Sequence, residues 1–268
     1  YDPCEEESCN IRKEQGGGNT SSFLCARKAV GKAVDFPSSI GYNGDKKERQ
    51  KKIDMIQAVI FDMDGVIIDS EGIYLKDQLE FARKKNPDVT IDQLFGMVGA
   101  TKKDAWEVFA RAVNNGQSWE ELRDEYRKNN LYSKIDYTKI YRPEVTEVLK
   151  NLKSKGYKLA VASSTQLDLV EHVLQVNGIR DYFKIVVSGN QFTRSKPDPE
   201  IYCFTADKLG VKAENCLVVE DSTIGITAAK RAGMKIAAVI DNRYGFDQSQ
   251  ADYFLTRVKD VIEAAERA

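Results

Sequence analysis

Residues 58–70 read AVIFDMDGVIIDS and carry the clearest structural signal in the chain. The apolar, β-branched run at 58–61 predicts a buried strand of a parallel sheet. Asp62 and Asp64 follow it directly, separated by one residue and followed by Gly65. In an open α/β sheet, ligands bind in the crevice beyond the carboxyl ends of the strands. We therefore expect both carboxylates to point into that crevice, where adjacent negative charges are costly unless a cation or a chemical step requires them.

From residue 54 onward, apolar strand-like runs alternate with helical patterns. Repeated alternation of this kind predicts an α/β fold, with a Rossmann-like, doubly wound parallel sheet and right-handed crossovers. Gly178 and Gly233 stand where glycines commonly follow the last turn of a helix. We expect strands at 58–61, 159–162, 185–187, 217–219 and 236–240, and helices at 167–176, 199–209 and 224–232.

One long interval interrupts this alternation. Between residues 71 and 141 only helical periodicity occurs, and it predicts an all-helical cap domain inserted directly after the first strand. Residues 53–70 and 142–268 then form the α/β catalytic core. A cap beside the carboxylate pair would select substrates and exclude water. The expected cap helices lie at 73–82, 91–95, 105–113 and 119–126.

The composition argues against several functional classes. The 268 residues include 40 basic and 41 acidic side chains, and a net charge of −1 does not suit a nucleic-acid or anionic-membrane surface. No apolar run approaches the ~20 residues that cross a bilayer, so we expect no membrane association. The single histidine, His172, and the absence of a Cys-x-x-Cys pair argue against a zinc site. We expect His172 to be an ordinary surface or packing residue.

The cysteines favour a reducing, cytoplasmic environment. They are odd in number and scattered, which does not suit a disulfide framework. Cys203 and Cys216 lie in apolar patterns typical of buried thiols. The five positions are 4, 9, 25, 203 and 216.

Residues 1–52 differ in composition from the rest of the chain. They contain three consecutive glycines at 16–18, clusters of Ser, Thr and Asn, and a charged stretch at 45–52, with few periodic apolar positions. We expect a largely flexible extension with one short helix over 23–34. A cleaved targeting segment is the alternative, although the preceding acidic residues and the short apolar part do not fit a secretory signal.

Four polar segments lie at successive predicted element ends. Alone, each has an ordinary structural explanation, such as a turn, a helix N-cap or an exposed residue before a proline. Their occurrence in order, each at a strand or helix end beside the same crevice, favours one shared site. The segments are Asp62 with Asp64, Ser163-Ser164-Thr165, Ser195-Lys196-Pro197 and Glu220-Asp221-Ser222.

These motifs resemble those of the haloacid dehalogenase superfamily of phosphatases and phosphomutases. The likeness spans about residues 57–261, the cap included, and is most specific in FDMDGVIIDS at 61–70 and VEDS at 219–222. Within the superfamily, the chain is similar to the branch of β-phosphoglucomutase and phosphoglycolate phosphatase. The resemblance implies phosphoryl-transfer chemistry with Asp62 and Asp64 as the catalytic pair.

The groups themselves favour the same chemistry. Phosphate-monoester hydrolysis is among the slowest uncatalysed reactions, and a carboxylate nucleophile, here Asp62, divides it into two displacements through an aspartyl-phosphate. At an effective dielectric constant of 20, like unit charges 4 Å apart repel by about 4 kcal/mol, so phosphate and nucleophile need a counter-charge. Mg²⁺ is the usual partner of phosphates. Its expected ligands are Asp62, the backbone carbonyl of Asp64, Asp221 and, as a fourth, Glu220.

The remaining site residues have distinct expected roles. Lys196 supplies fixed positive charge to the phosphoryl oxygens. The hydroxyl of Ser163 and the backbone N–H of Ser164 bind the same oxygens. Asp64 protonates the leaving oxygen and then activates water, because two adjacent carboxylates favour separated pKa values and one of them can carry the proton.

Cap residues bear on the choice between hydrolysis and mutase activity. β-Phosphoglucomutases carry a cap histidine where this chain has Tyr74, and a lysine and an arginine in a recognition loop where it has Val98 and Lys102. Loss of the histidine and of the loop lysine weakens the reorientation of a sugar phosphate that the mutase reaction needs, so a phosphatase of a small phosphorylated metabolite is favoured over a phosphomutase of the β-phosphoglucomutase type. Thr101 and Lys102, in a segment that resembles the substrate-recognition loop, either face the substrate or begin a solvated helix.

Other features have structural interpretations. Asp69 and Ser70 are expected to start or cap the helix that enters the cap, and Trp106 and Trp119 to pack in its core. A catalytically idle binding protein with the same fold is a further alternative, which the intact motif set argues against. We expect a monomer or a weak dimer.

Overall fold

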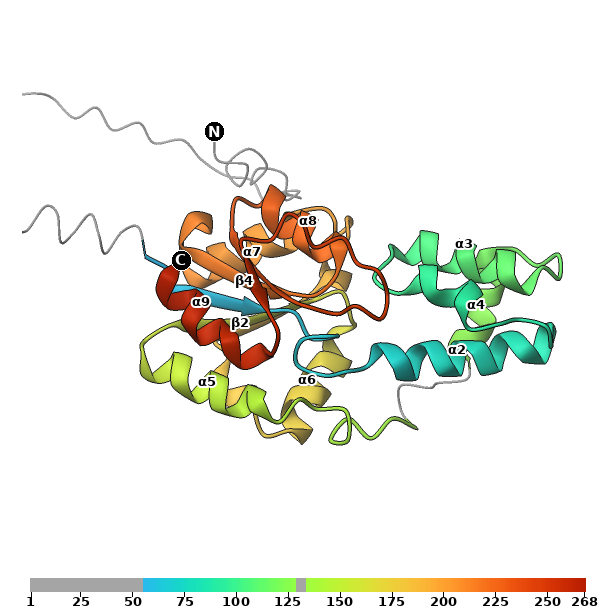
Figure 1. The fold of residues 1–268 in the computed structure, drawn as a ribbon, viewed down its shortest axis with the longest axis horizontal. Helices are drawn as coiled ribbons and strands as arrows, with labels where there is room; N and C mark the ends of the chain where they lie inside the picture. Colours follow the sequence, from blue (N-terminus) through green and yellow to red (C-terminus); the bar gives the residue numbers. More distant parts are fainter. Residues whose placement is uncertain (1–54, 129–133) are drawn as a thin grey trace, which may run out of the picture.

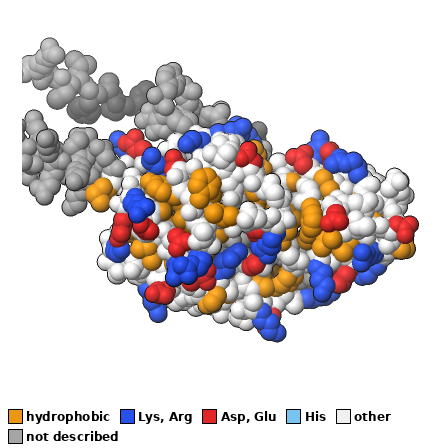
Figure 2. Space-filling model, in the orientation of Figure 1, with side chains coloured by type: hydrophobic (Ala, Val, Ile, Leu, Met, Phe, Trp, Pro, Cys, Tyr) orange, Lys and Arg blue, Asp and Glu red, His pale blue; other side chains and the backbone are white. Residues whose placement is uncertain are grey.

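The computed structural model describes residues 55–128 and 134–268. It shows an α/β core and a group of helices inserted after the first strand, beyond one end of the sheet (Figure 1). The expectations for residues 1–52, including the helix over 23–34, lie outside the described residues. Lys and Arg side chains are interspersed with Asp and Glu over the face drawn in Figure 2.

The sheet has six strands, all parallel, in the order β3-β2-β1-β4-β5-β6. The five predicted strands are confirmed, with ends shifted by at most one residue. The sixth was not predicted. The strands are β1 (Ala58–Phe61), β2 (Lys158–Ser163), β3 (Ile185–Ser188), β4 (Cys216–Glu220), β5 (Lys235–Val239) and β6 (Tyr253–Leu255).

Helices cover both faces of the sheet (Figure 1). Alternate residues of β1 point to opposite sides: Val59 and Phe61 join one hydrophobic cluster, and Ala58 and Ile60 join the other. Burial on both sides explains why the strands read as continuous apolar runs. The first cluster includes α5 (Glu144–Ser154), α6 (Leu167–Val176) and α9 (Val261–Arg267), and the second includes α7 (Glu200–Leu209) and α8 (Thr223–Arg231).

The strand order places a topological switch point between β1 and β4. The chain winds from β1 through β2 to β3 and then crosses to the other side of β1, where β4 pairs with it. Phe61 pairs with Val219, and the N–H of Asp62 donates to the carbonyl of Val219 at 2.9 Å. Asp62 follows Phe61 and Glu220 follows Val219, so these two residues lie side by side at the switch point, where α/β folds bind ligands.

The inserted helices have a hydrophobic core of their own. Leu75, Phe109 and Leu122, one from each long helix, are buried together. Trp106 is buried in this cluster and Trp119 packs against it, which confirms their packing role. The segment expected as a helix at 91–95 is a 3₁₀ helix. The elements are α2 (Glu71–Lys85), η1 (Asp92–Met97), α3 (Lys102–Val113) and α4 (Trp119–Arg127).

Several smaller expectations can be checked in the described residues. Gly178 and Gly233 follow α6 and α8 with φ of 66° and 73°, which confirms their place after helix ends. Cys216 is a buried free thiol. Cys203, half-buried on α7, is disulfide-bonded, so the expectation of reduced thiols is wrong there; sequence spacing does not reveal which thiols come together in space. No helix in the described ranges has the length and apolar character needed to cross a membrane.

Candidate active site

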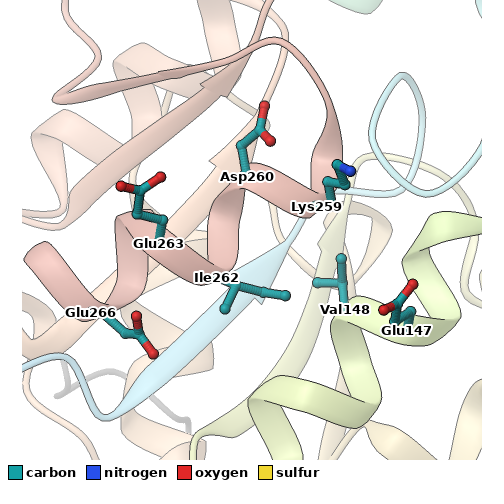
Figure 3. Close-up of a pocket in the computed structure, with 7 residues that line it drawn as sticks. All are labelled: Glu147, Val148, Lys259, Asp260, Ile262, Glu263 and Glu266. Carbon is teal, nitrogen blue, oxygen red and sulfur yellow. The ribbon is translucent and has the colours of Figure 1, made fainter.

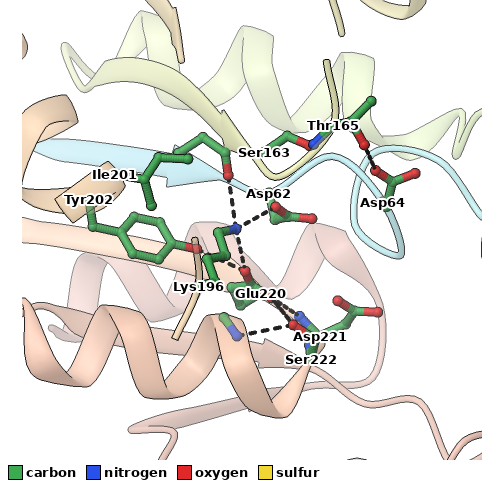
Figure 4. A network of polar contacts seen from close by, with 12 residues as sticks. Asp62, Asp64, Ser163, Thr165, Lys196, Ile201, Tyr202, Glu220, Asp221 and Ser222 are labelled. Atoms are coloured by element: carbon green, nitrogen blue, oxygen red, sulfur yellow. Dashed lines mark hydrogen bonds and ion pairs between the residues drawn. The ribbon is translucent and has the colours of Figure 1, made fainter. Parts of the chain in front are cut away.

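Three carboxylates converge at the switch point (Figure 4). Asp62 follows β1, Glu220 ends β4 and Asp221 comes next, and within this group the ligand oxygens all lie within 4.8 Å of one another. Their residues are 7%, 1% and 4% exposed. Buried charges this close require compensation by cations or protons.

Lys196 supplies part of that compensation. Its Nζ donates to Oδ1 of Asp62 at 2.6 Å, to Oε1 of Glu220 at 2.7 Å and to the carbonyl of Ala162 at 3.0 Å. The Tyr202 ring centroid lies 4.9 Å from Nζ, and its hydroxyl donates to the same Glu220 oxygen at 2.8 Å. The ammonium group is therefore held between the strands, with its position fixed from β1, β2, β4 and α7.

Both oxygens of Glu220 are occupied by hydrogen bonds. Oε2 accepts from the backbone N–H groups of Asp221 and Ser222 and from the hydroxyl of Ser222, at 3.0, 3.2 and 3.1 Å. Burial alone would raise the pKa of Glu220, but Lys196 and these hydrogen bonds hold it below its usual value. Gly225 permits the close approach of α8, because a Cβ there would lie 1.8 Å from Oε1.

The charge of Asp62 is only partly offset by Lys196, and no cationic side chain among the described residues contacts the Asp221 carboxylate. Burial raises the pKa of Asp62 to about 8, against the opposing effect of Lys196. Burial, together with repulsion from Glu220 and Asp62, raises the pKa of Asp221 well above its usual value. The Asp221 carboxylate lies against the turn at Gly65 (φ +74°), where a Cβ would come within 1.9 Å of Oδ2. This set of hard oxygen donors with excess negative charge fits a divalent cation.

Asp64 sits beside this group in a different environment. Its two oxygens accept hydrogen bonds from the hydroxyls of Ser70 at 2.6 Å and Thr165 at 2.7 Å. Burial raises the pKa of Asp64, while these two hydrogen bonds lower it. Ser70 stands at the N-cap position of α2 but makes no side-chain capping bond. The expected start of the helix at this position is confirmed, but the hydroxyl of Ser70 does not cap it, because it is directed to Asp64 instead.

The expected phosphate-binding serines lie at the end of β2. Ser163 is buried, and its hydroxyl accepts from the N–H of Thr165 at 3.1 Å. Ser164 is exposed, and the 3₁₀ helix η4 (Gly189–Gln191) that follows β3 approaches it closely, since a Cβ on Gly189 would lie 3.3 Å from the Ser164 Cα. Figure 4 shows Ser163 and Asp62 at neighbouring strand ends.

The two expected cap residues are not joined to this group. Thr101 caps α3: its hydroxyl donates to Asp104 at 2.6 Å and accepts from the Asp104 N–H at 3.3 Å. Lys102 is exposed, and partial burial together with Arg127 lowers its pKa. Within the described ranges, no hydrogen bond or ion pair connects Thr101 or Lys102 with the acidic group, so their contact with substrate stays a prediction.

Three residues near the site were not assigned a role from the sequence. Thr165 binds Asp64, and Tyr202 binds Glu220, across 101 and 18 positions of the chain. Glu71 opens α2, and burial, with repulsion from Asp64, raises its pKa to about 8. An acidic residue directly after the DS at 69–70 was the available signal for Glu71. His172 lies elsewhere on α6, edge-on to the Tyr137 ring at 5.8 Å, as expected for a packing residue.

A hollow between α5 and the end of the chain lies apart from the motif residues (Figure 3). Two of its acidic side chains form ion pairs: Glu266 with Lys155, and Glu263 with Arg267. Its lining consists of Glu147, Val148, Lys259, Asp260, Ile262, Glu263 and Glu266.

The family profile of haloacid dehalogenase-like hydrolases matches residues 59–239, from the start of β1 to the end of β5. The chain belongs to this family. Membership confirms the resemblance inferred from the motifs, the fold class and the hydrolase class of the enzyme. In this hydrolase, the matched segment contains all four polar segments and the cap helices.

Relatives with assigned names match most of the length of the hydrolase. A Thermotoga maritima protein named phosphorylated carbohydrates phosphatase is 33% identical over 183 residues, which is 67% of this chain and 83% of the relative. A phosphoglycolate phosphatase of Aquifex aeolicus is 32% identical over 212 residues, 78% of this chain and 96% of the relative. A crystal structure assigned as β-phosphoglucomutase from Thermotoga maritima superimposes with a TM-score of 0.62 at 28% identity, covering 80% of this chain and 100% of that chain.

Proposed function

We propose that this hydrolase is a Mg²⁺-dependent phosphatase of small phosphorylated metabolites, sugar phosphates among them, and works through an aspartyl-phosphate on Asp62. The convergence of Asp62, Glu220 and Asp221 around Lys196 is the observation that supports it. The relatives named for phosphorylated carbohydrates and phosphoglycolate support a small phosphorylated substrate.

The proposed ligands of the metal ion are Asp62, Asp221 and the backbone carbonyl of Asp64. When bound, the ion supplies positive charge that offsets the repulsion between a phosphate and the carboxylate nucleophile. Glu220 is a less available ligand than the sequence suggested, because both of its oxygens already accept hydrogen bonds. We assign Glu220 mainly to holding Lys196 in place.

Asp62 is the nucleophile in this proposal. Its Oδ1 accepts from Lys196, whereas Oδ2 receives no hydrogen bond from the described residues and is free to attack phosphorus. The bond from Oδ2 to phosphorus forms as the bond to the leaving oxygen breaks. The hydroxyl of Ser163 and the N–H of Ser164 bind the remaining phosphoryl oxygens. The positive charge of Lys196 stabilises these oxygens at a distance, because its N–H donors are held by Asp62, Glu220 and the carbonyl of Ala162.

Asp64 carries the proton in both displacements. Burial raises its pKa, so a protonated fraction is present to neutralise the leaving oxygen. The resulting carboxylate then takes a proton from the water that attacks the aspartyl-phosphate, which releases phosphate and restores Asp62. Ser70 and Thr165 position this carboxyl group through its two oxygens.

Asp62→Asn tests the mechanism directly. We expect kcat for p-nitrophenyl phosphate to fall by a factor on the order of 10⁴ or more, because the amide is not a nucleophile. Asp207→Asn makes the same chemical change on an exposed residue of α7 and should retain full activity. Circular dichroism checks that both variants fold. Full Mg²⁺-dependent turnover by a folded Asp62→Asn variant would overturn the mechanism.

Mutase activity is the second candidate, since one solved relative is assigned as β-phosphoglucomutase. The position expected for the mutase cap histidine is Tyr74 on α2. Incubation with β-glucose 1-phosphate separates the two: a phosphatase releases inorganic phosphate, whereas a mutase yields glucose 6-phosphate. We expect phosphate release.

A further inference from the structure

The loop between β5 and β6, residues 241–248, reaches from the core to the cap. The Tyr244 ring meets the Phe95 ring edge-on at 6.3 Å, and Tyr244 packs against the hydrophobic cluster of the cap. Phe246 lies next to Tyr244 at 5.8 Å between ring centroids. The core thus contributes two aromatic side chains to the surface where the cap meets it.

Phe246 contacts the turn between η1 and α3 at Gly99. A Cβ built on Gly99 would lie 2.6 Å from Cε1 and 3.2 Å from Cζ of Phe246, so the ring rests directly on the turn backbone. Gly99 has φ +66°, which other residues rarely adopt. This turn leads within two residues to Thr101, the N-cap of α3. The position of Phe246 therefore fixes where this edge of the cap can lie.

The same loop is anchored beside the catalytic groups. Arg243 donates to both oxygens of Asp69 at 3.2 and 2.7 Å, in the segment that joins Asp64 to α2. Gln248 donates to the carbonyl of Asp221 at 2.6 Å and to that of Val239 at 2.8 Å. The loop is thus tied to the core at both ends.

The aromatic residues also lie near the first turn of α2. The Tyr244 hydroxyl would be 3.6 Å from a Cβ on Gly72, one residue after Glu71. Ser70, the residue before this turn, hydrogen-bonds Asp64. A leaving group that accepts the proton of Asp64 departs beside this turn, so the 241–248 loop borders the space it occupies.

We propose that Phe246 and Tyr244 are specificity-positioning residues: they hold the 98–101 turn of the cap against the core and so set the size of the leaving group that fits. This inference rests on the proposed phosphatase function. It assigns substrate selection to a core loop as well as to the cap. Substrates whose leaving group is large enough to reach the turn, such as hexose and hexitol phosphates, depend on this contact, whereas acetyl phosphate does not.

Phe246→Ala tests the proposal on a panel of phosphate esters that runs from acetyl phosphate and phosphoglycolate to hexose and hexitol phosphates. We expect KM for the large esters to rise, because they depend on this contact. The range of kcat/KM values across the panel should therefore narrow by about tenfold. Turnover of acetyl phosphate should be retained. Phe254→Ala, the same change at a 56% exposed residue of β6, should leave the spread unchanged.

A double-mutant cycle isolates the contact. Gly99→Ala should strongly raise KM for the large esters in the wild-type background, because the methyl group displaces the Phe246 ring. In the Phe246→Ala background, Gly99→Ala should raise KM for these esters less, since the ring is gone and only the backbone strain at φ +66° is left. Phe246→Leu, which keeps an apolar side chain, should restore most of the discrimination and guards against misfolding of the alanine variant.

The outcomes separate the two hypotheses. If acetyl phosphate and p-nitrophenyl phosphate are not hydrolysed by the wild type, the proposed function fails. If they are hydrolysed but Phe246→Ala leaves the spread of kcat/KM unchanged, the positioning role of the loop is overturned. Strictly additive effects of the two substitutions on ln KM would overturn it as well.

Discussion

Lys196→Met removes the positive charge that the buried carboxylates contact within the described part of the chain. The side chain is 3% exposed and donates to Asp62 and Glu220 at 2.6 and 2.7 Å. Methionine keeps a similar volume and an unbranched shape, so the substitution changes charge more than packing. The carboxylates that remain would be buried next to one another without their cation.

The size of the effect follows from this geometry. Removing one partner of a buried ion pair costs about 3–5 kcal/mol, because it leaves an uncompensated charge. For a chain of this length, that corresponds to a fall in Tm of about 6–20 °C. Loss of Lys196 also raises the pKa values of Asp62 and Glu220, so protons replace part of the missing charge in acid. The destabilisation should therefore be smaller at pH 5 than at pH 8.

Thermal denaturation of metal-free protein at both pH values, with turnover of p-nitrophenyl phosphate in Mg²⁺, measures these effects. Turnover should fall by about 10²–10³-fold. Lys158→Met is the matched control: among residues 55–128 and 134–268, the ammonium of Lys158 donates to the carbonyls of Leu209 and Gly210, at 2.7 and 3.4 Å, and to no carboxylate. Its loss should cost about 0.5–1.5 kcal/mol at either pH. A Lys196→Met variant with wild-type Tm at pH 8 and wild-type turnover would refute the electrostatic account.

Two further predictions concern the groups around the carboxylates. Thr165→Val removes the hydrogen bond that lowers the pKa of Asp64, so the pH optimum of kcat should move upward by up to about one unit; Thr138→Val, which removes an exposed bond to Asp136, should leave it in place. Glu71 has a folded pKa of about 8 against an ordinary value of 4.5, so its contribution to the stability of the metal-free protein falls as pH rises between those values. Glu71→Gln should therefore raise Tm at pH 8 and leave it unchanged at pH 4, measured in EDTA. An equal gain in Tm at both pH values would contradict this. Added Mg²⁺ should reduce the gain at pH 8 by neutralising the same charges.

The core strands were predictable because a parallel sheet covered on both faces produces short runs of buried apolar residues. β1 shows this in every residue of Ala58–Phe61. β6 (Tyr253–Leu255) escaped prediction because it has three residues, lies at the edge of the sheet and exposes Phe254. α9 was missed because two of its three buried residues are alanines, which carry little periodic signal.

The site was predictable only as far as its polar residues stand at element ends. Asp62 and Glu220 each follow a run of buried residues, so their shared edge of the sheet could be inferred from order alone. Hydrogen bonds across long sequence separations could not. Whether the hydroxyl of Ser70 caps α2 or binds Asp64 depends on the path of the chain after the turn at Gly65, and either choice fits the local sequence.

The electrostatics of the site fit the proposed use of both a lysine and a divalent cation. Lys196 is committed to Asp62 and Glu220, and its ammonium donors are used by these carboxylates and the carbonyl of Ala162. Asp221 has no hydrogen bond to its carboxylate from the described residues, and its pKa is raised well above the usual value. A phosphate entering such a site meets net negative charge despite the lysine. In the proposed mechanism, Mg²⁺ at Asp62 and Asp221 would add the positive charge that the phosphate needs, while Lys196 stays paired with Asp62 and Glu220.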